Sequence, residues 1–273
     1  IGAQLGADVM LARALGPAVM GQVILGFSIA GLLSIFLLFG SAEIAMQLHA
    51  RGDHDPARVL TASLVMLAAG SCVSAALGAG IAAALGLSGQ GAWILWAILG
   101  VLGLNGIASA LNHALVAHDA SGRDLPVTAA SRLALLGGVA WGAWHEDVVM
   151  ILGAYAAAAA LLAAGRAWMI HRHCFALRWR WDREIFETLW RRGRAVGLGA
   201  IFGTVTNRAD MLALQRLAGA LDVGLYGACY RIVSGLQTAS TALAFALYPY
   251  LERGVSWARK LYLALPLLGA LGI

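Results

Sequence analysis

Five charged residues lie inside or beside long apolar stretches of this sequence. They are Asp8, Glu43, Arg208, Asp210 and Arg231. On insertion scales a charge near the centre of a membrane helix costs roughly 2.5–3.5 kcal/mol, so each one needs an opposite charge, a water-filled cavity or a place at a helix end. Charges in such places therefore indicate either a functional site or a structural ion pair.

The two arginines have the chemistry of an anion-binding site. The planar guanidinium of Arg208 or Arg231 can donate paired hydrogen bonds to phosphate oxygens, and it stays charged at any working pH. The alternatives are ion pairs with Asp210 or Glu43, or extension of the side chain to the membrane interface. Because Lys260 is the only lysine, the use of arginine in itself carries little information.

The three acids are candidates for coupling transport to an ion gradient. A carboxyl group in a low-dielectric site can take up a proton in the working pH range. Asp8, Asp210 and Glu43 could therefore bind protons or sodium ions, with structural ion pairing as the favoured alternative for any one of them. His171 and His173 lack the cysteine or acidic neighbours that complete a metal site, so neither a metal nor another cofactor is expected.

A polar stripe runs along residues 91–117. Asn105, Ser109 and Asn112 are spaced by four and three residues, so they lie on one face of a helix, with His113 beside them. Asn105 and Asn112 could bind a glycan along a transport path. Hydrogen bonding between helices is the other explanation, and we favour it.

The elements that hold these residues are predicted to be membrane-spanning helices. Hydrophobic residues make up 60% of the chain and charged residues 12%, against about 25% charged in globular domains. Apolar runs of about 18 residues or more recur, each long enough to cross about 30 Å of hydrocarbon, and the alternation of a strand is absent. The prediction is an all-α integral membrane protein, a polytopic helix bundle of about nine spanning segments.

These segments cover most of the chain. They are expected at 1–14, 18–48, 57–86, 91–117, 126–144, 147–171, 195–217, 222–250 and from 258 onward. Because the chain begins without methionine and stops inside an apolar run, we expect a fragment truncated at both ends.

Basic residues predict the orientation of these helices. The loops after the second, fourth, sixth and eighth segments carry fourteen of them, and the alternate loops carry two. The fourteen are Arg51, Arg58, Arg123, Arg132, Arg172, Arg178, Arg180, Arg183, Arg191, Arg192, Arg194, Arg253, Arg259 and Lys260. By the positive-inside rule these loops are cytoplasmic, in a bacterial inner membrane. The net charge of +5 thus orients the protein and requires no nucleic acid as partner.

The longest polar interval divides the chain into three parts. We expect a first lobe of six helices at 1–171, a cytoplasmic amphipathic linker at 172–194, and the start of a second lobe at 195–273. In the linker, Asp182 can cap a short helix that Gly193 would end. The apolar residues on one face of this helix are Ile185, Phe186, Leu189 and Trp190, and we expect that face to lie on the membrane surface.

An internal repeat supports two lobes. Residues 7–27, ADVMLARALGPAVMGQVILGF, are similar to residues 209–230, ADMLALQRLAGALDVGLYGACY. Allowing one residue of slippage, the matching positions are Asp8 with Asp210, Arg13 with Arg216, and Gly21 with Gly224. Chance similarity between two segments rich in alanine and leucine is the alternative. Two repeated lobes related by an axis along the membrane normal form a transporter architecture, with substrate at the interface between them.

Two segments resemble signatures of a known family. LARALGPAVMGQVILGFSIAGLLSIFLLFGSAEIAMQLHAR is similar to the first-to-second helix region of the polysaccharide-transport branch of the multidrug, oligosaccharidyl-lipid and polysaccharide (MOP) flippase superfamily. NRADMLALQRLAGALDVGLYGACYRIVSG, continuing to ALAFALYPYLER, is similar to its seventh-to-eighth helix region. The resemblance implies two six-helix lobes of the kind found in multidrug antiporters. It also implies movement of a polyprenyl-pyrophosphate-linked glycan from the inner to the outer leaflet by alternating access.

Three functions are open at this point. The leading one is an oligosaccharide flippase for O-antigen, capsule or exopolysaccharide repeat units, with the lipid-linked glycan, the bilayer, and a polymerase or glycosyltransferases as partners. A multidrug antiporter of the same architecture would expel organic cations and would favour a more acidic cavity. A membrane glycan ligase or glycosyltransferase needs large external loops with catalytic groups, and the expected outer loops are only a few residues long. We therefore expect a transporter without catalytic residues, not an enzyme.

Overall fold

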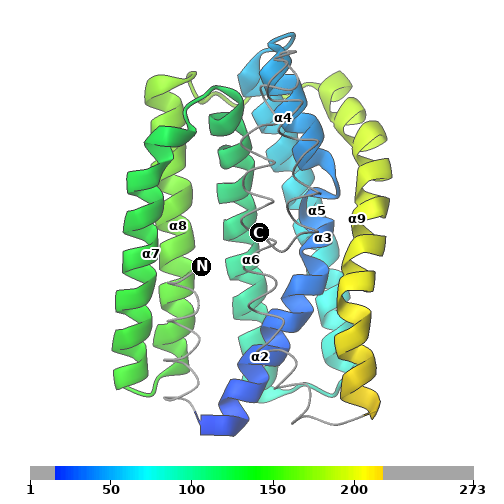
Figure 1. Ribbon diagram of the computed structural model, residues 1–273, viewed down its shortest axis with the longest axis vertical. Coiled ribbons are helices and arrows are strands. Elements are labelled where there is room, and N and C mark those ends of the chain that lie inside the picture. Colours follow the sequence, from blue (N-terminus) through cyan, green and yellow to red (C-terminus); the bar gives the residue numbers. More distant parts are fainter. Residues whose placement is uncertain (1–15, 218–273) are drawn as a thin grey trace, which may run out of the picture. The chain divides into compact units, whose positions relative to one another are not determined.

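The computed structural model describes residues 16–217, and every regular element in that range is an α-helix (Figure 1). The helices are α2 (Gly16–Leu33), α3 (Ile35–Leu38), α4 (Ser41–Arg51), α5 (Pro56–Ala84), α6 (Gly89–Ala117), α7 (Ser121–Trp144), α8 (Val148–His173) and α9 (Arg183–Leu217). The chain divides into two compact units, residues 1–197 and 198–273, and the boundary falls within α9. The all-α prediction is confirmed for the described residues. The division into lobes at 171 and 194 stays a prediction.

Within residues 16–217, three helices are long and apolar enough to cross a membrane: α5, α6 and α8, with 29, 29 and 26 residues. A fourth candidate span is bent by 42° and consists of Leu25–Leu38 followed by Ser41–Arg51. These helices make the chain an α-helical membrane protein, whereas the count of nine spans extends past the described residues and stays a prediction.

The first unit is held together by apolar contacts centred on α6 and α8. Ile94 and Ile98 of α6, Val139 of α7 and Ile151 of α8 are almost fully buried in one cluster. Small residues bring helices close, as expected where van der Waals packing drives association in lipid. A Cβ atom added to Gly165 of α8 would meet the side chain of Val127 on α7. The helices α6, α7 and α8 thus form one packed group.

The second apolar segment, expected as one helix over 18–48, is broken. Phe39 and Gly40 both have positive φ, 41° and 73°, a region that L side chains adopt only at a cost and that ends a right-handed helix. α3 therefore stops at Leu38, and α4 starts in a new direction at Ser41. The prediction of an uninterrupted span is wrong at this point, because backbone conformation overrides the continuous apolar sequence.

The broken segment packs directly on the backbone of α5. A Cβ atom added to Gly70 would collide with the carbonyl oxygens of Phe36 and Leu37, while one added to Gly80 of the same helix meets nothing within 4 Å. We expect Gly70→Ala to lower the free energy of unfolding by about 1–3 kcal/mol, as overpacking does. Gly80→Ala should leave it unchanged or slightly higher. Thermal unfolding of the purified protein in detergent distinguishes them, and equal effects of the two substitutions would contradict the close contact.

The start of α9 confirms one prediction about the linker and corrects two. Asp182 caps the helix, with Oδ1 accepting from the backbone N–H of Glu184 at 3.0 Å and of Ile185 at 3.3 Å. The helix does not end at Gly193 but continues to Leu217. Its apolar side packs on protein, with Ile185 and Leu189 buried against α4 and α5, so that side is not free to lie in the membrane surface.

Candidate functional site

An ion pair inside the first unit joins α6, α7 and α8. Arg166 donates through Nε to Asp124 Oδ1 at 2.9 Å and through Nη2 to Oδ2 at 2.6 Å. Thr128 donates to the same carboxylate at 2.8 Å, and Nη1 of Arg166 donates to the carbonyl oxygen of Ala108 at 2.8 Å. Both charged side chains are only 11% exposed. This two-pronged geometry neutralises both charges and binds three helices together.

Sequence reasoning missed this pair. Asp124 was assigned to a loop before a helix starting at 126, and Arg166 was not singled out within the apolar run 147–171. The sequence does contain a signal for this ion pair, because Arg166 lies five residues before the end of the apolar run. Its charge requires a partner there. Since the carboxylate is occupied by Arg166 and Thr128, the pair is a structural element and offers little capacity to bind substrate.

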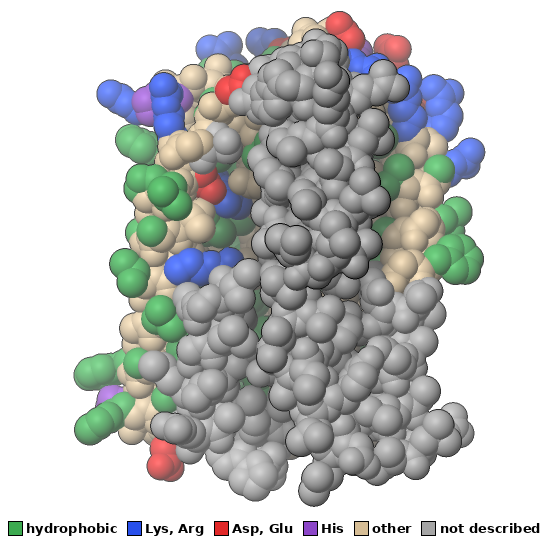
Figure 2. Space-filling view, viewed as in Figure 1, with side chains coloured by type: hydrophobic (Ala, Val, Ile, Leu, Met, Phe, Trp, Pro, Cys, Tyr) green, Lys and Arg blue, Asp and Glu red, His purple; other side chains and the backbone are tan. Residues whose placement is uncertain are grey.

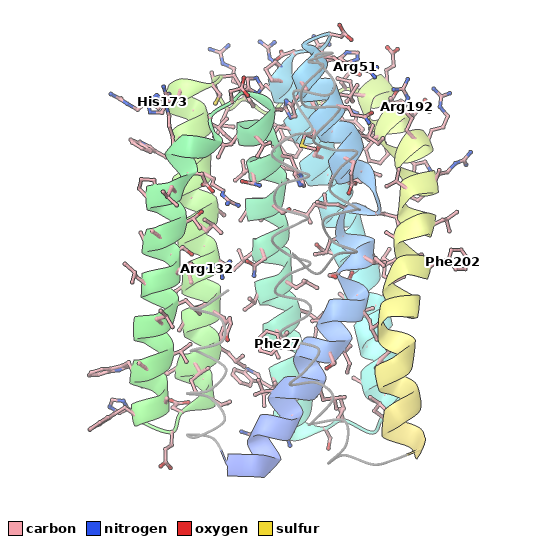
Figure 3. The ribbon with its side chains drawn as sticks, in the orientation of Figure 1. Phe27, Arg51, Arg132, His173, Arg192 and Phe202 are labelled. Atoms are coloured by element: carbon pink, nitrogen blue, oxygen red, sulfur yellow. The ribbon has the colours of Figure 1, made fainter. Side chains whose placement is uncertain are left out.

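Arg132 differs from Arg166 because no acid pairs with it among the described residues. The sequence interpretation placed it in a basic loop, but it lies in the middle of α7, a helix of 24 residues from Ser121 to Trp144. At 1.5 Å per residue, Arg132 is about 17 Å from the start of this helix. Its side chain is exposed, and Figure 3 shows it at mid-height of the bundle.

Among the residues that the structure describes, no acid near Arg132 is left to balance its charge. It follows Asp124 and Thr128 at intervals of four residues, so the three side chains form one stripe along α7. Asp124 lies about 12 Å away along the helix and is already paired with Arg166. An arginine without an acidic partner inside a membrane-spanning helix needs water or an anion beside it. Arg132 is therefore the described residue best suited to contact an anionic substrate.

Asn105 lies at a similar depth on α6. It is twelve residues before Ala117, about 18 Å along the helix, and α6 connects to α7 through three residues, 118–120. Its Nδ2 donates to the carbonyl oxygen of Val101 on its own helix at 2.9 Å, and the side chain is exposed. The favoured explanation, a hydrogen bond between helices, is therefore not seen for Asn105. Asn112 is half-buried two turns nearer the end of α6.

Glu43 occupies the first turn of α4, directly after the break at Phe39 and Gly40. One carboxyl oxygen, Oε2, is buried and has no hydrogen-bond partner in the described part of the chain. The start of a helix stabilises a negative charge through the helix dipole. A buried carboxylate with a free oxygen can accept a proton or a small cation, which agrees with the coupling role expected for Glu43.

The side chains of the remaining predicted site residues lie outside the part of the chain that the structure describes. Arg208 and Asp210 lie on α9 with side chains outside the described set, and Asp8 and Arg231 lie outside residues 16–217. Within that range no group of three or more histidine, cysteine, aspartate or glutamate side chains could hold a metal ion.

Comparison with known proteins gives one match. A family model described as "Polysaccharide biosynthesis protein" matches residues 2–255, most of the chain and all of the described helices. Neither a curated protein nor a solved structure matches it.

Proposed function

Since the chain belongs to the polysaccharide biosynthesis protein family, the family of polysaccharide and O-antigen flippases in the MOP superfamily, we propose that it flips a lipid-linked glycan. The family consists of transporters and not enzymes, and the chain is a membrane transporter related to polysaccharide export. The proposed substrate is a polyprenyl-pyrophosphate-linked oligosaccharide repeat unit, which moves from the inner to the outer leaflet of a bacterial inner membrane.

The observation that supports this substrate most directly is that Arg132 has no acidic partner within the described part of the chain. A pyrophosphate crossing the membrane needs a cationic partner away from bulk water, and a guanidinium can donate to two of its oxygens at once. Asn105, at a similar depth, has an amide that can bind sugar hydroxyls. Arg208 and Arg231 remain candidate ligands of the same anion on the grounds of their residue type.

The distribution of charge supports the proposed orientation. Figure 2 shows that lysine and arginine side chains gather mainly at the upper end of the visible face, with a few near mid-height. Arg51 and Arg192, labelled in Figure 3, both lie at this upper end. We propose that it faces the cytoplasm, where basic loops are retained.

The same charges argue against the multidrug antiporter as the second candidate. A cavity that binds organic cations needs free carboxylates at membrane depth. In the described part of the first unit Asp124 is neutralised by Arg166 and Arg132 has no acidic partner, so Glu43, with one buried oxygen that lacks a hydrogen bond, is the acid left for a cation. An anionic substrate fits this arrangement better than a cationic one.

Depletion of the intact protein in its host tests the proposed function. We expect polyprenyl-pyrophosphate-linked repeat units to accumulate on the cytoplasmic leaflet, since their synthesis continues while their export stops. A strain supplied with the protein in trans should clear them. Normal glycan export combined with increased sensitivity to cationic dyes would instead identify a drug antiporter.

The three acids allow a separate test of ion coupling. We expect Asp8→Asn, Asp210→Asn and Glu43→Gln each to abolish gradient-driven transport while the protein remains in the membrane, because the neutral amide cannot exchange a proton or bind a cation. Glu187→Gln, an exposed change on α9, serves as the control. Glycan transport in proteoliposomes with an imposed ion gradient is the measurement, and any of the three that transports normally has no coupling role.

A further inference from the structure

Reciprocal ion pairs join the starts of α5 and α9. Asp55 caps α5 by accepting from the backbone N–H of Ala57 at 3.0 Å, as Asp182 caps α9. Arg180, just before α9, donates to Asp55 Oδ2 at 2.8 Å. Arg58, in the first turns of α5, donates to Asp182 Oδ2 at 3.0 Å. Each capping acid thus binds its own helix and the arginine of the other segment, and we call these four charged residues the ionic clasp.

The ionic clasp is partly open to water. Its arginine side chains are 47–48% exposed and its acids 21–33%. A single exposed ion pair contributes little, but here each acid also caps a helix, and the backbone N–H of Arg180 donates to Thr61 Oγ1 at 3.2 Å. The hydrogen bond from Arg58 lowers the pKa of Asp182 below its ordinary value of 3.8, so its carboxylate stays charged at neutral pH.

Apolar packing continues the contact along the helix. Ile185 and Leu189 of α9 are buried against Ile44 and Leu48 of α4 and Val59 of α5. Burial of apolar side chains of this size stabilises a contact more than partly exposed ion pairs do. The ionic clasp therefore mainly fixes the position at which α9 starts, and the apolar contact mainly keeps the first part of α9 in place.

One turn further, the backbones themselves meet. A Cβ atom added to Gly193 would lie 3.1 Å from the backbone nitrogen of Ser41, and one added to Gly197 would lie 2.8 Å from the carbonyl oxygen of Phe39. The spacing of four residues is the small-residue pattern that lets helices approach closely. The ring of Phe39 also stacks on Trp190, with centroids 5.8 Å apart. The first half of α9 therefore crosses the broken segment at its break.

We propose that residues 180–197 are a fixed part of the first lobe and stay docked on α4 and α5 throughout the transport cycle. The ionic clasp holds the start of this segment, the apolar contact of Ile185 and Leu189 holds its middle, and the close backbone approach at Gly193 and Gly197 holds its end. On this proposal, the helix of the linker expected at 172–194 docks on protein and does not lie on the membrane surface. The inference depends on the proposed function only in assuming that the two lobes move during a cycle.

Distance measurements test the docking without relying on transport. Spin labels at His54→Cys, in the loop before α5, and Glu187→Cys, on α9, are placed in the intact protein after Cys72, Cys174, Cys229 and any further cysteine have been replaced by serine. We expect one narrow distance distribution that an imposed ion gradient or added lipid-linked glycan does not change. Gly193→Leu, which drives a side chain into Ser41, should broaden it and shows that undocking is detectable.

A cross-link then tests whether docking is compatible with transport. Arg58→Cys and Asp182→Cys, joined by a short bifunctional methanethiosulfonate reagent, replace the ion pair by a covalent tie. We expect the cross-linked protein to transport within about twofold of the same protein after reduction. A second distance population, or transport below a tenth of the reduced rate, would overturn the proposal. If the distribution of distances between the spin labels stays narrow but no sample transports glycan, the proposed function is refuted and the docking of residues 180–197 stands.

Discussion

Replacing Arg132 with glutamine is expected to lower glycan transport roughly 30-fold. The change removes at least one charge-assisted hydrogen bond to the substrate anion, worth about 2 kcal/mol, and each 1.4 kcal/mol corresponds to about tenfold. Arg132→Lys keeps the charge but loses the planar fork, so we expect a smaller loss. Initial rates in proteoliposomes at substrate concentrations below saturation are the measurement.

Stability distinguishes a substrate ligand from a structural charge at this position. Arg132 has no acidic partner among the described residues, so its removal should leave thermal stability equal or higher while transport falls. Arg183→Gln, on the exposed surface of α9, is the matched control and should change neither property. If Arg132→Gln destabilises the protein and transport falls only in proportion to the folded fraction, Arg132 is structural.

The largest effect on stability is expected at the buried ion pair. Asp124→Asn leaves the guanidinium of Arg166 buried without a counter-charge, and such changes cost about 3–5 kcal/mol. Arg166→Gln leaves the carboxylate in the same position and should cost a similar amount. Either variant should therefore show a strongly lowered unfolding temperature or a reduced folded yield, followed by tryptophan fluorescence on heating.

The double variant makes this prediction specific. Because Asp124→Asn and Arg166→Gln together remove both charges, we expect the pair to cost clearly less than the sum of the single changes. The exposed pair of Arg183 and Glu187 provides the comparison, with an interaction of only about 0.3–0.5 kcal/mol. Strictly additive effects at Asp124 and Arg166 would show that the bonds between them contribute nothing to folding.

The two arginines of the first unit illustrate how alike a functional and a structural charge are in sequence. Arg132 and Arg166 both stand in apolar helices, and both would be expected to need a partner. Arg166 finds it in an aspartate 42 residues away, whereas Arg132 finds none within residues 16–217. Only the packing of α7 on α8 separates them, so the candidate ligands Arg208 and Arg231 need the same structural test.

The sequence by itself determined the helical class and most helix positions. The segments expected at 57–86, 91–117 and 147–171 agree within a few residues with α5, α6 and α8, and Asp182 caps α9 as predicted. These features depend on residues close together in the chain: apolar runs long enough for the bilayer, and an acid that bonds to backbone N–H groups two and three residues later. Family membership also followed from such local signatures.

The tertiary structure alone decided which charges are neutralised, where the second span breaks and what the first half of α9 touches. The partners in these contacts are far apart in sequence, 42 residues for Arg166 with Asp124 and 125 for Arg180 with Asp55. The break at Phe39 and Gly40 lies against the backbone of α9, and Phe36 and Leu37, just before it, lie against that of α5. Periodicity and capping act within one helix, whereas a buried charge or a close glycine contact is fixed by the neighbouring helix.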